Sequence, residues 1–300
     1  DEAGALRNLQ AESVQNDFEK AKNNAENQWN TELSKIIIQG GTKDQKIIFY
    51  SALYHTLLNP NLYQDVDGQY RWTDLKIHKT DGYSNYSVFS LWDTYRALHP
   101  LMTIINSNKT VDWIKTFLDQ DEKGGMLPVW ELSGNETNCM IGYHSVSVIY
   151  DAYKKGITNF NARAALFAML RYAESKKYGL GQYIKEGYIS NDIESESVSK
   201  ILEYAYDDWC IAMLAKDLGE VDTYSRFIAR AQNYKNAFDQ KTKFMRGKLG
   251  AIWYSPFDPK EINNFFTEGN SWQYSFSVPQ DISGMINLYG GKKGFEQKLD

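Results

Sequence analysis

This 300-residue chain has little of what marks several common protein classes. It contains only two cysteines, Cys139 and Cys210, and neither lies in a CxxC or His-rich segment, which argues against a disulfide framework or a cysteine-based zinc site. Six prolines and 21 glycines are too few for a collagen-like, mucin-like or disordered chain. No apolar run approaches the roughly 18 residues that a membrane-spanning helix needs. With 42% hydrophobic and 24% charged residues, the chain is expected to bury a sizeable core.

The charge balance is also unremarkable. The 33 Lys and Arg residues against 38 Asp and Glu residues give a net charge of −5, and no basic block is present. This argues against nucleic acid or an anionic membrane as the main partner. Residues 1–10 lack the basic start and apolar stretch of a signal peptide. Either the protein is cytoplasmic, or the chain begins after processing or inside a longer protein.

The common catalytic motifs are missing as well. The sequence contains no GxGxxG, GxxxxGK[ST], HExxH or GxSxG segment. Its four histidines are not spaced as metal ligands; they are His55, His78, His99 and His144. Carboxylates and aromatic rings remain as the available chemical groups, and these are the groups that glycoside hydrolysis uses.

Aromatic residues are the abundant feature, at 14% of the chain with 21 Tyr, 14 Phe and 8 Trp. Two explanations are open. The rings can fill a core of closely packed helices, or some of them can stack on sugar faces while carboxylates bind hydroxyl groups.

Hydrophobic spacing predicts a mainly helical protein. The expected helices cover residues 5–36, 43–58, 89–105, 109–121, 142–155, 161–176, 197–217, 221–237 and 292–300. Short turns alternate with long loops at 121–142, 177–196 and 241–270, which is typical of stacked helical hairpins whose long loops build a site on one face. A small β-hairpin is expected near residues 63–78, with Asp67 and Gly68 as its turn. Because 292–300 reads as a helix under way, the chain is expected to stop inside a domain.

Four segments combine acids with aromatic residues. In the first, Asp93 follows Trp92 near an expected helix start, where it could cap the helix or bind sugar hydroxyls beside a stacking ring. The second places Glu136 and His144 in a Gly-punctuated loop that leads into a helix, although a lone His is more often structural than catalytic.

The third segment, around residues 202–209, puts Glu203 and Asp207 on one helical face, with Asp208 on the adjacent one. Like charges at this spacing repel, so they need a cation, an arginine elsewhere or substrate hydroxyls; the alternative is a solvated acidic face. In the fourth segment, Glu268 lies among Phe and Trp residues, surroundings that would raise a carboxyl pKa as a general acid requires. The alternative there is a turn with packed aromatic residues.

These segments resemble one family. FSLWDTYRALHPL (89–101), GGMLPVWELSGNETNCMIGYHS (124–145), LEYAYDDWCIA (202–212) and FTEGNSWQYSFSVPQD (266–281) look like the catalytic domain of glycoside hydrolase family 92. The resemblance covers most of the chain, and the four motifs occur in the family's order. It implies a calcium-dependent, inverting exo-α-mannosidase of bacterial glycan degradation. The implied location is the periplasm, the cell surface or outside the cell.

The resemblance also implies an architecture, in which an N-terminal β-sandwich packs against an (α/α)6 toroid. Residues 1–40 would form a leading helix or linker, and residues 41–300 a toroid that is incomplete at its C-terminus. Glu268 would be the general acid. The resemblance implies substrate contacts or nearby positions for the following residues: Trp92, Asp93, Glu136, His144, Asp207, Asp208, Asn270 and Trp272.

The family's general-base Asp motif and its NEPSHH-like calcium and mannose segment do not occur in this sequence. We therefore expect the base and most calcium ligands to lie outside residues 1–300, and the isolated chain to be inactive. Two other functions remain open at this stage: another (α/α)6 glycosidase or lyase, and a carbohydrate-binding helical domain without catalysis.

Overall fold

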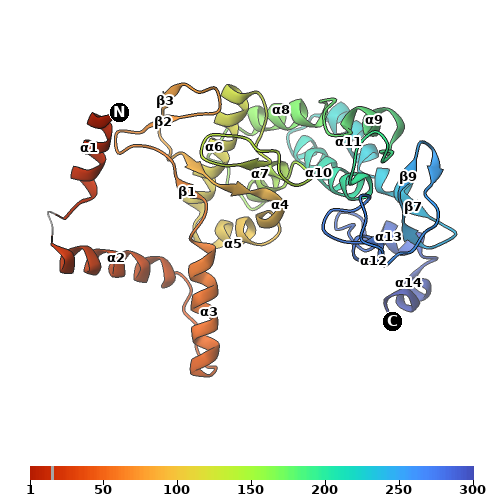
Figure 1. Ribbon diagram of the computed structural model, residues 1–300, viewed down its shortest axis with the longest axis horizontal. Helices are drawn as coiled ribbons and strands as arrows, with labels where there is room; N and C mark the ends of the chain where they lie inside the picture. The colour runs from red at the N-terminus through yellow and green to blue at the C-terminus, as the bar shows by residue number, and fades with distance from the viewer. Residues whose placement is uncertain (15–16) are drawn as a thin grey trace.

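The computed structural model describes residues 1–14 and 17–300. Helices dominate the chain (Figure 1). They are α1 (Glu2–Glu12), α2 (Phe18–Leu33), α3 (Lys43–Thr56), α4 (Leu91–Thr94), α5 (Leu98–Ile105), α6 (Ser107–Gly124), α7 (Ser145–Lys154), α8 (Ala162–Ala173), α9 (Leu180–Glu186), α10 (Ser197–Asp217), α11 (Val221–Arg230), the 3-10 helix η1 (Asn233–Ala237), α12 (Ser271–Tyr274), α13 (Ile282–Leu288) and α14 (Lys292–Leu299).

The strands are short and form two-stranded antiparallel pairs. They are β1 (Asn61–Leu62), β2 (Gln69–Arg71), β3 (Ile77–Lys79), β4 (Tyr86–Ser87), β5 (Phe89–Ser90), β6 (Trp130–Glu131), β7 (Phe238–Asp239), β8 (Phe244–Met245), β9 (Lys248–Leu249) and β10 (Ile252–Trp253). The mainly helical fold class is thereby confirmed. Closure of the helices into an (α/α)6 toroid stays a prediction.

Helix α10 is the centre of the core. It packs against α7, α8, α11 and η1, and Figure 1 shows it in the middle of the helical body. Most of its residues are buried, including polar ones such as Ser199, Lys200 and Glu203. A helix that is enclosed on nearly every side must find internal partners for its charged side chains, because water cannot solvate them.

The N-terminal part differs from the expected single helix over 5–36. The chain forms two helices, and the second begins at the N-cap Asp17, whose side chain accepts a hydrogen bond from the Lys20 backbone N–H. Capping by an Asp favours a new helix start over continuation of the first helix.

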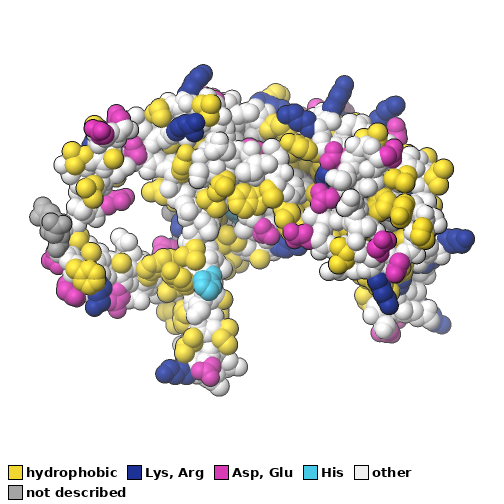
Figure 2. Space-filling view, viewed as in Figure 1, with side chains coloured by type: hydrophobic (Ala, Val, Ile, Leu, Met, Phe, Trp, Pro, Cys, Tyr) yellow, Lys and Arg dark blue, Asp and Glu magenta, His cyan; other side chains and the backbone are white. Residues whose placement is uncertain are grey.

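Helix α3 was predicted correctly, but its apolar residues are largely exposed. Only Leu53 of this helix is buried, whereas Ile47 is 53% and Ile48 69% exposed. The helix points away from the helical body (Figure 1), and hydrophobic side chains lie on the surface around α2 and α3 (Figure 2). The amphipathic pattern thus identified the helix but not a partner for its apolar face among the described residues.

The hairpin near residues 63–78 is present, with a different turn. Strand β2 pairs with β3, and Tyr70 lies opposite His78. The loop between them closes through the Leu75 N–H, which donates to the Trp72 carbonyl. Asp67 and Gly68 form a separate turn before β2, so the expectation that they close the hairpin was wrong.

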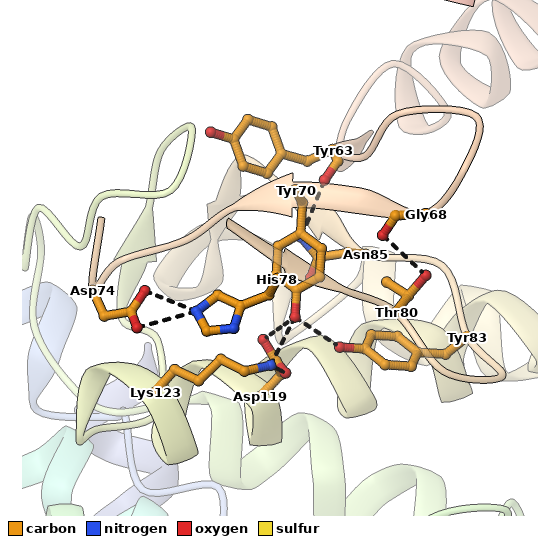
Figure 3. A network of polar contacts seen from close by, with 10 residues as sticks. All are labelled: Tyr63, Gly68, Tyr70, Asp74, His78, Thr80, Tyr83, Asn85, Asp119 and Lys123. Atoms are coloured by element: carbon orange, nitrogen blue, oxygen red, sulfur yellow. Dashed lines mark hydrogen bonds and ion pairs between the residues drawn. The ribbon is translucent and has the colours of Figure 1, made fainter. Parts of the chain in front are cut away.

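The hairpin is attached to α6 through a buried phenol (Figure 3). The Tyr70 hydroxyl donates to Asp119 Oδ2 at 2.8 Å and accepts from Lys123 Nζ at 2.8 Å. Lys123 also pairs with Asp119. All three side chains converge on one point, so the hydroxyl joins the hairpin to two successive turns of the helix.

Three further expectations need correction. Residues 89–105 do not form one helix: β5 pairs with β6, and α4 and α5 follow it separately. The helix expected over 221–237 divides into α11 and η1. The expected loop 177–196 contains α9. In the first case the backbone of Ser90 pairs with Trp130 across the sheet, a long-range contact that local periodicity does not encode.

We expect Tyr70→Phe to lower the free energy of unfolding by about 1–2 kcal/mol, because Asp119 and Lys123 lose a buried hydrogen-bond partner. Chemical denaturation of the purified protein measures this change. Tyr224→Phe is the matched control: Tyr224 lies on α11, its ring contacts the Lys216 ammonium at 5.6 Å, and it has no part in the network of Tyr70, Asp119 and Lys123. Equal stability of the two variants would contradict the anchoring role.

Candidate active site

A pocket of about 240 Å³ collects side chains from three distant segments. It is lined by Trp92, Arg96, Glu203, Thr267, Glu268, Gln273, Tyr274 and Ser277. Trp92 belongs to α4 and Glu203 to α10, whereas Glu268 lies on the loop before α12. The structure therefore brings together two residues that the sequence analysis singled out, Trp92 and Glu268. We call this space the Glu268 pocket.

Glu268 has an exposed side chain and a left-handed backbone, with φ of +48°. Its neighbour Thr267 is held on both sides: the Thr267 N–H donates to Ser199 Oγ at 2.9 Å, and its carbonyl accepts from the Tyr274 hydroxyl at 2.7 Å. Phe266 is buried beneath the loop. The aromatic residues thus support the backbone, while the carboxyl group remains at the open side of the pocket. A strained residue held by its neighbours is typical of a functional position.

Trp92 is held in place by two contacts, one at the edge of its indole ring and one over the ring face. Its indole N–H donates to Glu203 Oε1 at 3.3 Å, and the Arg96 guanidinium lies 5.2 Å from the ring centroid. Arg96 also donates to the Trp92 carbonyl at 2.9 Å. These contacts hold the flat ring at the wall of the pocket, where it can stack on a sugar face.

His144 lies beneath this wall, between two carboxylates. Its Nδ1 is 2.8 Å from Asp207 Oδ1, and its Nε2 is 2.9 Å from Glu203 Oε2. The first contact is a hydrogen bond, while the second is an ionic contact without an aligned N–H, so Nε2 has no hydrogen-bond partner among the described residues. The Tyr95 ring stacks on the imidazole at 4.0 Å.

This arrangement makes His144 a buried cation. Burial alone would lower the pKa of His144, but the charges of Asp207 and Glu203 outweigh burial and raise it to about 10. The imidazolium is therefore the compensator that the acids at positions 203 and 207 require. Asp207 also accepts from the Tyr143 N–H at 2.8 Å, which fixes the start of α7 relative to α10.

Asp208 has a different partner. It is fully buried and pairs with Arg230, whose Nη2 lies 2.9 Å from Oδ1. It accepts from the Tyr143 and Tyr183 hydroxyls at 2.9 and 3.0 Å. Burial raises the pKa of Asp208 to about 6 in spite of these contacts. Asp207 and Asp208 thus contact other side chains in the protein interior and do not line the Glu268 pocket.

The remaining predicted residues lie outside the lining of this pocket. Asp93 is exposed and accepts a hydrogen bond from the Ser90 hydroxyl. Glu136 organises its own loop, because its carboxylate accepts from the backbone N–H groups of Val129, Trp130 and Asn138.

Asn270 caps α12 and accepts from the Gln273 N–H. Trp272 packs edge-on against Phe244 at 4.7 Å, with the Lys298 ammonium 4.4 Å from its ring centroid. Both residues therefore position the loop and helix that follow Glu268.

Four residues that line the pocket were not predicted as site residues: Arg96, Glu203, Gln273 and Tyr274. For Glu203 the sequence does contain a signal, its four-residue spacing to Asp207. What the spacing could not show is that His144, from another element, lies between the two carboxylates. Gln273 and Tyr274 belong to the short helix α12 that directly follows the Glu268 loop, so they accompany Glu268 into the pocket.

Three further features were considered, namely metal-binding clusters, membrane-spanning helices and cysteines. Within 1–14 and 17–300, no group of three or more His, Cys, Asp or Glu side chains could hold a metal ion. No helix in the same ranges is long and apolar enough to cross a bilayer. Cys139 is exposed and Cys210 buried, and both are free thiols.

Comparisons with known proteins point to one family. The model of the glycosyl hydrolase family 92 catalytic domain matches residues 4–300. A family GH92 α-mannosidase of Bacteroides thetaiotaomicron has a similar structure, with a TM-score of 0.95 and 42% identity over 99% of this chain and 40% of that chain. A second structure, the family GH92 inverting mannosidase of Bacteroides thetaiotaomicron VPI-5482, gives a TM-score of 0.95 and 33% identity over 100% of this chain and 42% of that one.

A curated relative from Arthroderma benhamiae is described as an uncharacterized secreted glycosidase. It is 27% identical over 329 residues, covering 95% of this chain and 38% of the relative. The chain therefore spans about two fifths of the length of the proteins that it matches.

The buried position of His144 predicts a pH-dependent contribution to stability. Because its folded pKa is raised to about 10, the contribution is complete below the unfolded value of about 6.5 and is lost as the pH rises through 10. Relative to His144→Gln, the wild-type advantage in unfolding free energy should fall by about 3–5 kcal/mol between pH 6.5 and 10. Denaturation at a series of pH values measures the difference.

His55→Gln is the control for this experiment, because His55 is exposed and should show no such trend. A difference between wild type and His144→Gln that does not change with pH would contradict a charged His144.

Proposed function

The chain belongs to glycosyl hydrolase family 92, and from this membership we propose that the protein containing it is an inverting exo-α-mannosidase. Its substrate would be an oligosaccharide with a terminal α-linked mannose, for example an α-1,2-linked mannose of a mannan or an N-glycan. The observation that carries the proposal is the Glu268 pocket, where an accessible carboxyl group lies in one cavity with a fixed indole ring and a second carboxylate.

In this proposal Glu268 is the general acid. It donates its proton to the glycosidic oxygen as the bond to the anomeric carbon breaks, so that the leaving sugar departs as a neutral alcohol. Trp92 stacks on the terminal mannose. An inverting mechanism also needs a carboxylate base about 6.5–9.5 Å from the acid, with a water between them. We place that base, an Asp by family resemblance, outside residues 1–300.

Glu203 has a positioning role in the same pocket. Its Oε1 holds the Trp92 indole, and its Oε2 is paired with the His144 imidazolium.

Calcium does not fit the described residues of this chain. The ion takes six to eight oxygen ligands, and no group of acidic residues in 1–14 and 17–300 provides a metal site. We propose that the whole protein depends on calcium, with ligands that lie elsewhere than in these residues. No step assigned to Glu268 or Trp92 passes through the ion.

We further propose that an N-terminal β-sandwich of the same parent protein packs near α2 and α3. The exposed Ile47 and Ile48 support this, because apolar side chains gathered on a surface are typical of interfaces. A periplasmic, cell-surface or secreted location is supported by the secreted glycosidase among the relatives.

The acid role predicts a dependence on the leaving group. In the complete enzyme, Glu268→Gln should lower kcat for a mannobiose by about 10²–10⁴-fold. For 2,4-dinitrophenyl α-mannoside, whose leaving group needs no proton, the decrease should be less than about tenfold. Steady-state kinetics with both substrates tests this.

Glu261→Gln serves as the matched control, since Glu261 lies exposed on the same loop and outside the pocket lining. An equal loss on both substrates would refute the assignment of Glu268 as the acid. Hydrolysis by the isolated 300-residue chain would refute a base outside it.

A further inference from the structure

A buried carboxylate contacts the segment that leads to Trp92. Glu131, at the end of β6, is fully buried and accepts three hydrogen bonds. Its Oε2 accepts from the Val88 N–H at 3.0 Å, and its Oε1 accepts from the Ser87 hydroxyl at 3.0 Å and from the Gly134 N–H at 2.6 Å. One side chain therefore connects the chain just before β5 to the loop that follows β6.

An ionised carboxyl group is unfavourable at this buried position. Burial raises the pKa of Glu131 to about 7; the three hydrogen bonds lower it without offsetting burial, and the charge of Glu136 in the same loop raises it further. An apolar side chain of similar size would fill the same space without this cost. Packing alone therefore does not account for a carboxylate here, and a strongly perturbed carboxyl group is typical of functional sites.

The backbone that this carboxylate contacts is strained at Val88. Its φ of +69° lies in the left-handed region, where a branched side chain clashes with the backbone, so a valine in this conformation is an outlier. Such a residue persists only where its surroundings hold it. Glu131, which accepts a hydrogen bond from the Val88 N–H, is in position to hold it.

The strained residue sets the direction in which the chain reaches the candidate site. Val88 directly precedes β5, and β5 leads without a break into α4, which carries Trp92. Ser90 in β5 pairs with Trp130, and its carbonyl accepts from the Thr94 hydroxyl at 2.9 Å. Because these contacts join β5 and α4 into one unit, a change of φ at Val88 would displace the unit, and the Trp92 ring with it.

We propose that Glu131 is a positioning residue of the enzyme: by holding Val88 in its left-handed backbone, it keeps the Trp92 ring in the pocket wall. The inference rests on the proposed function for the role of Trp92, which is to stack on the terminal mannose. The carboxylate is specifically required, because a glutamine has one side-chain oxygen for the N–H groups of Val88 and Gly134 and would turn its own NH2 group against one of them.

The test is a double-mutant cycle in the complete enzyme. Glu131→Gln removes the charge with little change in size, and Val88→Asn introduces a residue that tolerates the left-handed backbone. The two single variants and the double variant are compared with wild type. Glu122→Gln is the control, because Glu122 is an exposed carboxylate on α6. KM and kcat are measured for a mannobiose and for 2,4-dinitrophenyl α-mannoside, which share the terminal mannose.

We expect Glu131→Gln to raise KM by about three- to tenfold for both substrates, which is the range of one aromatic contact. A contact made equally in the ground state and the transition state affects KM alone, so kcat should stay within about twofold of wild type. In the Val88→Asn background, the same substitution should raise KM less than about twofold, because the asparagine backbone needs no carboxylate to hold it.

An unchanged KM in Glu131→Gln would overturn the proposal. So would an increase of the same size with and without Val88→Asn, since Glu131 would then not act through Val88. A decrease in kcat confined to the mannobiose would also overturn it, because that result is expected when proton donation by Glu268 is impaired. If Glu131→Gln gives no folded protein, a folded and active double variant supports the proposal, and an unfolded one contradicts it.

A spectroscopic measurement separates this inference from the proposed function. In protein labelled with 5-fluorotryptophan, fluorine NMR identifies the Trp92 resonance as the one that is missing from Trp92→Phe. This resonance should shift in Glu131→Gln and return in the double variant, whichever substrate the protein acts on. If wild type hydrolyses neither mannoside while the resonance behaves in this way, the mannosidase assignment is wrong and the positioning role stands. A Trp92 resonance that does not respond to Glu131→Gln would refute the positioning role alone.

Discussion

The buried charge of His144 is the interaction on which the rest of the site depends. Glu203 and Asp207 lie one turn apart on a helix that is enclosed by other helices, so neither carboxylate is fully solvated. The imidazolium between them satisfies both and connects α7 to α10. Removal of one member of a buried ionic group leaves an uncompensated charge, which costs far more than the group contributes when it is complete. The position of Trp92 follows from this arrangement, because its indole N–H donates to Glu203, the one of the two carboxylates that lines the Glu268 pocket.

Helix α10 thus contributes to two cavities and to the core. Its N-terminal turns place Glu203 in the Glu268 pocket, and Lys200 and Tyr204 in a second cavity of about 230 Å³, while Asp208 is bonded to Arg230 in the interior. The loop before α12 is tied to the same end of the helix, since the Val198 N–H donates to the Phe265 carbonyl at 3.0 Å. A displacement of α10 would therefore change both cavities together.

The sequence was sufficient for the elements whose contacts are local. Helices α3, α6, α8, α10 and α14 follow from apolar spacing, and the acid-aromatic segments led to Trp92 and Glu268, which the structure places in one pocket. It was insufficient where the deciding contact comes from a distant segment. The partner of Asp208 is 22 residues away in Arg230, and that of Asp207 is 63 residues away in His144, so their interior positions could not be distinguished from a solvated acidic face. Likewise, Ser90 lies in a strand and not in a helix, because its backbone pairs with that of Trp130, 40 residues away in the sequence.

The two thiols of the chain have opposite environments, with a practical consequence for labelling. Burial raises the pKa of the Cys210 thiol well above its usual range, so it remains protonated and inert toward alkylating reagents. Cys139 is exposed, and its chain neighbours Asn138 and Met140 line a cavity of about 230 Å³ beside the N-terminal part of α10. A thiol-reactive fluorophore or spin label would therefore attach to this chain at one position, beside the cavity, without any engineered cysteine. The signal of a label on Cys139 would therefore report directly on whether that cavity is occupied.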